Sequence, residues 1–196
     1  PAFVREVVED IAFQARHEKK IDKRSGVSQR MPISVIETAV SNAERRALVA
    51  GVSLDVPRVT DIYAALPSMT GKFELEYEGE LKGADQVARD LVRATAGNIF
   101  TGYFPDADLT KVVEWFDLGG AITLSDTTSS AALVDQARSV QGLLDLAHRL
   151  GIAPDAPVPV LAAGVDFVLE GLYAQKKISR SDERGYHGAE PVRRPQ

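Results

Sequence analysis

The sequence predicts a mainly α-helical fold with a small two-stranded β element. Apolar residues recur every three or four positions along most of the chain, beginning with Phe3, Val7 and Ile11, and this spacing places them on one face of a helix. Strict alternation of apolar and acidic residues occurs at residues 73–77, which is typical of a strand. A second short strand is expected at residues 121–124, where it can pair with the first.

Glycine and proline divide the helical stretches. The first helix is expected to run to about Glu18, and the second to carry an apolar face and end near Gly51. A short third helix is expected to close at Pro67. Two further helices are expected, one broken by Pro105 and one terminated by Gly119.

Two long helices are expected in the last third of the chain, one over residues 133–147 and ended by Gly151, the other over residues 161–172. Apolar residues step by four and three positions in both, which favours antiparallel packing through the short proline-containing loop between them. Beyond that point charged residues mix with glycine and proline. Residues 176–196 are therefore expected to form a flexible charged tail.

The composition excludes several classes of protein. Hydrophobic residues make up 44% of the 196 residues and charged residues 26%, as in ordinary globular domains. The net charge of −5 argues against a nucleic-acid-binding domain, which usually carries a basic surplus. The absence of cysteine excludes disulfides and thiolate metal sites. No apolar run is long enough for a bilayer span, so we expect no membrane contact and a cytoplasmic location.

Motifs for autonomous catalysis or metal binding are absent from the sequence. It lacks both G-x-x-x-x-G-K-[ST] and G-x-G-x-x-G. His17, His148 and His187 lie far apart and form no H-x-x-x-H pair, so no metal site is expected. The alternating glutamates of residues 74–80 share one face of the expected strand and are expected to face solvent.

Arg30 is the principal candidate for a functional residue. It lies just after a charged loop, at the N-terminal edge of the second expected helix, whose apolar face would hold it in place. A guanidinium offers a planar fork of donors that suits a phosphate, and a helix N-terminus also favours anions. The alternative is an exposed arginine that contacts only its own loop.

Four stretches of the sequence together resemble the C-terminal part of AAA+ ATPases of the magnesium chelatase and MoxR type. They are residues 25–33, 42–48, 56–62 and 70–75. The stretch Ser-Gly-Val-Ser-Gln-Arg-Met-Pro-Ile at residues 25–33 is the most specific of them. The resemblance rests on motifs over residues 1 to about 80 and on general pattern beyond them. It implies a helical lid subdomain over residues 1–72, and a C-terminal helical extension with short strands over residues 73–175.

The resemblance implies roles for two arginines. Arg30 is similar to the sensor-2 residue, which reaches the γ-phosphate of ATP, in this subgroup across a subunit boundary. Arg58 follows a proline at a helix start and is a second candidate for nucleotide binding, with a surface salt bridge as the alternative. The neighbouring Arg45 and Arg46 are expected to be solvated, or paired with carboxylates at a subunit boundary.

The resemblance also implies ATP and Mg²⁺ as cofactors of the complete protein, and an upstream AAA+ core and a homo-oligomeric ring as partners. The parent would couple ATP hydrolysis to the remodelling of a protein partner or to metal chelation. Because the chain opens directly on a helical pattern at Pro1, we expect a fragment of a longer protein without activity of its own. The alternative is a non-enzymatic helical module that docks a protein partner.

Overall fold

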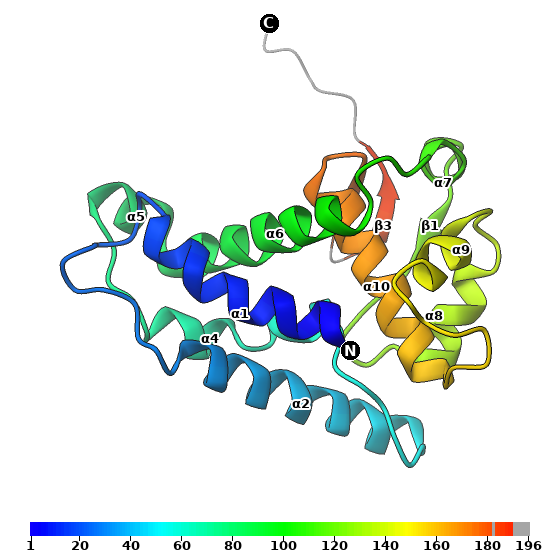
Figure 1. The fold of residues 1–196 in the computed structure, drawn as a ribbon, viewed down its shortest axis with the longest axis horizontal. Coiled ribbons are helices and arrows are strands. Elements are labelled where there is room, and N and C mark those ends of the chain that lie inside the picture. The colour runs from blue at the N-terminus through cyan, green and yellow to red at the C-terminus, as the bar shows by residue number, and fades with distance from the viewer. Residues whose placement is uncertain (182, 190–196) are drawn as a thin grey trace, which may run out of the picture.

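The structure is a computed structural model that describes residues 1–181 and 183–189 (Figure 1). The described residues are mainly helical with one small sheet, which confirms the predicted fold class. The elements are, in order, α1 (Ala2–His17), α2 (Met31–Ala50), α3 (Val59–Tyr63), α4 (Leu66–Thr70), α5 (Tyr77–Lys82), α6 (Ala84–Tyr103), α7 (Thr110–Asp117), β1 (Ala121–Ile122), α8 (Ser130–Ala137), α9 (Leu143–His148), α10 (Val158–Ala174), β2 (Ile178–Ser181) and β3 (Gly185–Gly188).

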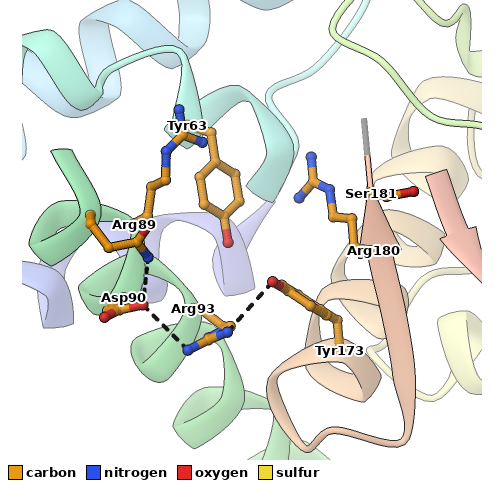
Figure 2. Close-up of a pocket in the computed structure, with 8 residues that line it drawn as sticks. Tyr63, Arg89, Asp90, Arg93, Tyr173, Arg180 and Ser181 are labelled. Carbon is orange, nitrogen blue, oxygen red and sulfur yellow. Dashed lines mark hydrogen bonds and ion pairs between the residues drawn. The ribbon is translucent and has the colours of Figure 1, made fainter. Parts of the chain in front are cut away.

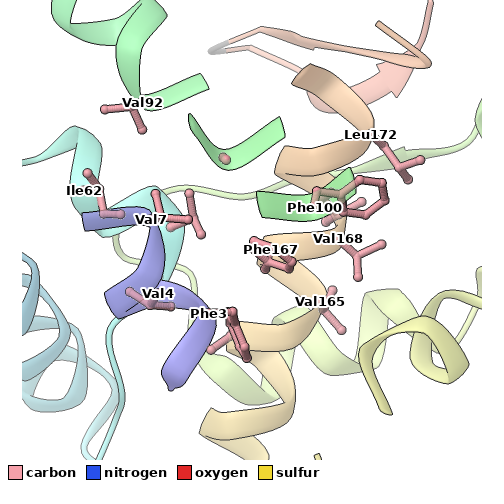
Figure 3. Packing of buried hydrophobic residues seen from close by; sticks show 14 of the residues in the cluster. Phe3, Val4, Val7, Ile62, Val92, Phe100, Val165, Phe167, Val168 and Leu172 are labelled. Atoms are coloured by element: carbon pink, nitrogen blue, oxygen red, sulfur yellow. The ribbon is translucent and has the colours of Figure 1, made fainter. Parts of the chain in front are cut away.

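Helix α10 is buried along most of its length. Every residue from Ala162 to Leu172 is buried, because α6 packs on one side of the helix and α8 and α9 on another (Figure 1). Phe167 of this helix lies 5.0 Å from the ring of Phe3 and 6.1 Å from that of Phe100, between ring centroids (Figure 3). Each such buried aromatic side chain contributes roughly 1.5–3 kcal/mol.

Helices α1 and α2 join this core through one apolar face each. The buried residues of α1, among them Val4, Val7 and Ile11, follow the spacing of the sequence pattern, and α1 packs on both α6 and α2. Helix α2 ends at Gly51, whose φ of 67° closes the helix as predicted. The helices of the described residues lack the combination of length and apolar character that crossing a bilayer requires.

The sheet has the order β1-β3-β2 and is antiparallel throughout. Residues 176–196 were expected to form a flexible tail, and this prediction is wrong for the strands β2 and β3. Tyr186 and His187 of β3 are buried, and Gly188 lies so close to the backbone of α7 that an added Cβ would be 2.7 Å from the Phe116 oxygen. Strand β1, from far earlier in the chain, pairs with the other edge of β3. Residue 182 and residues 190–196 lie outside the described part.

Residues 73–76 do not form the strand that their alternation predicts. They make only isolated bridges, Leu75 to Ile21 and Phe73 to Val27, and α5 begins at Tyr77. The expected partner at residues 121–124 pairs with β3 instead. The alternation therefore marks an extended segment that lies beside the loop between α1 and α2. The expected pairing of this segment with residues 121–124 is wrong.

The single long helix expected at residues 133–147 is two short helices, α8 and α9. Gly142 separates them with a φ of 88°, a left-handed conformation that interrupts helical hydrogen bonding. Both helices still pack against α10, as the apolar spacing predicts. Pro67 does not close a helix but occupies the first turn of α4, where its missing N–H leaves no hydrogen bond unmade.

Candidate functional site

Arg30 lies at the start of α2 and is exposed. Its backbone N–H donates to Ser28 Oγ at 3.3 Å. The next residue, Met31, is completely buried, and so is Val35 one turn further along. Within the described part of the chain, the Arg30 guanidinium forms no hydrogen bond or ion pair. The structure therefore places a solvent-accessible cation on a helix end that the core holds rigidly.

The loop before Arg30 is held by backbone hydrogen bonds to the segment after α4. The N–H of Ser28 donates to the Lys72 oxygen and that of Asp22 to the Glu74 oxygen, both at 2.9 Å. At the turn of this loop Gly26 has a φ of 73°, which favours glycine. The two segments are thus joined by isolated bridges and backbone hydrogen bonds just before α2 begins.

An open hollow of about 730 Å³ lies between these two segments, bordered by residues 25–30 and 71–74. Its lining includes two cationic residues, Arg30 and Lys72, and one carboxylate residue, Glu74. The Ser25 hydroxyl donates to that carboxylate. Such a rim can take an anionic group, since the cations outnumber the carboxylate and the α2 N-terminus lies beside them.

The structure does not bring Arg58 to this hollow. Arg58 is fully buried and donates through Nη1 to the Thr128 oxygen at 2.9 Å and through Nη2 to Ser130 Oγ at 2.6 Å. Burial, together with the positive charge of Arg46, lowers the pKa of Arg58. These contacts tie α3 to α8, and the burial disfavours a direct contact between Arg58 and a nucleotide.

Arg46 is buried as well, which contradicts the expectation that it is solvated. Its Nε donates to Asp55 at 2.8 Å and its Nη1 to Asp61 at 2.5 Å. Burial by itself would raise the pKa of Asp55, but the hydrogen bonds from Arg46 and Ser130 lower it below its ordinary value. Arg45, one residue earlier, points to the surface side and pairs with Asp126.

Two buried carboxylates on α10 were not foreseen. Asp166 accepts the Thr60 N–H at 3.0 Å, while its Oδ1 has no hydrogen-bond partner among the described residues. One turn later Glu170 accepts hydrogen bonds from Tyr63, Arg180 and Tyr186. Burial, then the charge of Glu170, raises the pKa of Asp166 to about 6. The signal in the sequence was two acids four residues apart in an otherwise apolar helix.

No protein-family model matches this chain, and no match is found among curated proteins or solved structures. The resemblance of residues 25–33 and their companions to AAA+ ATPases of the magnesium chelatase and MoxR type therefore stays a prediction.

Proposed function

We propose that this chain is the lid and C-terminal extension of a cytoplasmic AAA+ ATPase, in which Arg30 contacts the phosphates of ATP. The observation that carries the proposal is the position of Arg30, which is exposed and has no side-chain partner among the described residues, on a helix whose next residue is buried in the core. A guanidinium in such a place stabilises negative charge on a transferring phosphoryl group. Arg30 would act on a site completed by the core of the same protein or of a neighbouring subunit in a ring.

The residues around Arg30 fit this role. Lys72 adds a second cation on the rim of the hollow, and the hydrogen-bonded loop keeps the helix start from moving independently of the core. Among the described residues, no cluster of acidic or histidine side chains could hold a metal ion. In this proposal the ligands of Mg²⁺ therefore come from the upstream core, and Arg30 supplies charge alone.

The packing of α1 and α2 suggests how nucleotide state would reach the rest of the chain. Helix α1 contacts α2 on one side and α6 on the other, and α6 in turn contacts α10. A displacement of Arg30 between ATP-bound and ADP-bound states would therefore move the extension as one body with the lid. That coupling is what remodelling of a protein partner or assistance in metal chelation requires.

The helical interaction module remains the second candidate, and one surface favours it. Helix α2 and the loop after it expose several large apolar side chains, with Leu48 at 81%, Val49 at 65% and Leu54 at 60% exposed. Exposed apolar groups of this kind are typical of sites that a protein partner covers. This candidate needs no nucleotide and no contribution from Arg30.

ATP hydrolysis by the complete ATPase tests the proposal. We expect Arg30→Ala to lower the rate of ATP hydrolysis by about 10³-fold or more, which is the usual effect of removing an arginine that stabilises the transferring phosphoryl group. Ring assembly, which size-exclusion chromatography measures, should be retained. Arg24→Ala is the matched control, because Arg24 is an exposed arginine of the same loop that pairs with Asp22. Turnover at the wild-type rate in assembled Arg30→Ala rings would rule out the assignment.

A further inference from the structure

A second hollow lies between α6, the end of α3, the end of α10 and β2 (Figure 2). Its volume is about 190 Å³. Three arginines line it, two from α6 and one from β2, together with two tyrosines and one carboxylate: Arg89, Arg93, Arg180, Tyr63, Tyr173 and Asp90.

The Arg180 side chain lines this hollow and is held in place by several contacts. It forms an ion pair with Glu170, which is completely buried on α10. Its guanidinium also stacks over the Tyr63 ring at 5.0 Å and the Tyr186 ring at 5.3 Å, measured to the ring centroids. A long cationic side chain held by a buried carboxylate and two rings loses little further freedom when it binds a ligand.

Arg93 is positioned in a similar way on the facing wall. Its Nη2 donates to Asp90 at 3.3 Å, and its Nη1 lies 3.5 Å from the hydroxyl of Tyr173 (Figure 2). Because that hydroxyl accepts from Arg93, its own hydrogen remains able to donate into the hollow. Asp90 also forms an ion pair with Lys82, so this single carboxylate neutralises both Arg93 and Lys82 only in part.

Cations outnumber carboxylates in the lining of the hollow. Arg89, Arg93 and Arg180 line it, together with the carboxylate of Asp90. Asp85 and Glu170, the partners of Arg89 and Arg180, are not part of the lining. An anion is the group that such a concave, cationic and hydroxyl-bearing wall attracts.

We propose that this hollow binds a phosphate group. A tetrahedral oxyanion can accept from guanidinium groups on two walls and from the Tyr173 hydroxyl at once, whereas a planar carboxylate has only two oxygens to share. The cavity has room for a phosphate group, and the proposed ligand is inorganic phosphate or the phosphate end of a monoester. The site is separate from the Arg30 hollow and does not depend on its function.

Calorimetric titration with inorganic phosphate, at fixed ionic strength set with chloride, tests this inference on the chain itself. We expect saturable binding that Arg93→Gln weakens about tenfold or more, the usual effect of losing one charge-assisted hydrogen bond. Arg138→Gln is the matched control, because Arg138 pairs with an aspartate three residues earlier, as Arg93 does, but lies at the end of α8. Binding should be unchanged in this control.

Further variants distinguish the two hollows and the two sources of phosphate. Arg89→Gln, which alters a half-exposed side chain on the same wall, should also weaken binding, and thermal unfolding verifies that each variant is folded. The component of binding that Arg93→Gln weakens should be retained in Arg30→Gln, because the two hollows are lined by different residues. Tighter binding of phenyl phosphate than of inorganic phosphate would identify a monoester as the ligand, and the reverse would identify the free ion. Absent binding, or binding that only Arg30→Gln weakens, would overturn the inference.

Discussion

At the scale of single residues, burial decides what each charged side chain does. Arg45 and Arg46 are adjacent and chemically identical, yet Arg45 is half exposed while Arg46 is completely buried between two aspartates. Two buried guanidinium groups and their carboxylates hold α2, α3 and α8 together. Because removing one partner of such a pair leaves a buried charge unpaired, these contacts constrain the fold far more than surface pairs do.

Asp166 allows a test of this environment through the pH dependence of stability. Its pKa of about 6 in the folded chain lies above the ordinary value of 3.8, so the folded state binds the proton more tightly than the unfolded state. The contribution of Asp166 to stability is therefore full below about pH 4 and is lost as the pH rises through 6. Asp166→Asn keeps an acceptor for the Thr60 N–H but carries no charge.

We expect Asp166→Asn to gain stability relative to the wild type as the pH rises from 4 to 7, by up to about 3 kcal/mol. Urea unfolding of both proteins at several pH values measures the difference. Comparing the two proteins at each pH removes the opposing contribution of Asp55, whose pKa is lowered. A difference that is the same at pH 4 and pH 7 would contradict the assignment of a raised pKa to Asp166.

At the scale of the secondary-structure elements, glycines set where helices begin and end. Gly51 ends α2 and Gly142 precedes α9, both with positive φ. Gly102 differs, because it lies inside α6 with open space around its Cα. The same residue type therefore has a conformational role at two positions and no such role at the third.

Alanine substitutions separate these roles. Gly142→Ala should destabilise the chain by about 1 kcal/mol, because alanine is strained at a φ of 88° even though the nearest side-chain atom would be 3.7 Å away. Gly102→Ala should stabilise it by about 0.5–1 kcal/mol through higher helix propensity. Thermal unfolding measures both. An equal effect of the two substitutions would mean that the left-handed conformation does not separate α8 from α9.

At the scale of the whole molecule, one hydrophobic cluster extends from Phe3 of α1 to Tyr186 of β3. It crosses the expected boundary between a lid at residues 1–72 and an extension at residues 73–175 without a break. Stability of the first helices should therefore depend on packing near the end of the chain, since a shared core unfolds cooperatively.

Tyr186→Ala tests this dependence. Removing this fully buried ring, which also donates to Glu170, should cost about 3–5 kcal/mol. Amide hydrogen exchange in α2 should accelerate to a matching extent, although β3 packs mainly on β1, β2 and α7. Tyr77→Ala, at a side chain 72% exposed, is the control and should change little. Unchanged exchange in α2 of the Tyr186→Ala protein would show instead that the lid unfolds independently.

Helices were more predictable from this sequence than strands. The first two helices and α6 carry apolar residues at helical spacing, and α2 ends at glycine and α6 near proline, so local interactions suffice to indicate them. Strands β2 and β3 lack such a pattern, and the second neighbour of β3 in the sheet, β1, lies far earlier in the chain. Residues 73–76 have the pattern of a strand but no continuous partner, and alternation alone does not make a sheet.

The sequence by itself determined the helical class, the apolar faces of α1 and α2, and the place of Arg30 at the start of a helix. These depend on residue spacing and on helix ends, which are local properties. Only the tertiary structure decided that Arg58 and Arg46 are buried while Arg30 stays exposed, and that Arg93 and Arg180 face one hollow. Burial and convergence depend on which distant segments pack together, here α6, α10 and β2, and that is a property of the whole chain.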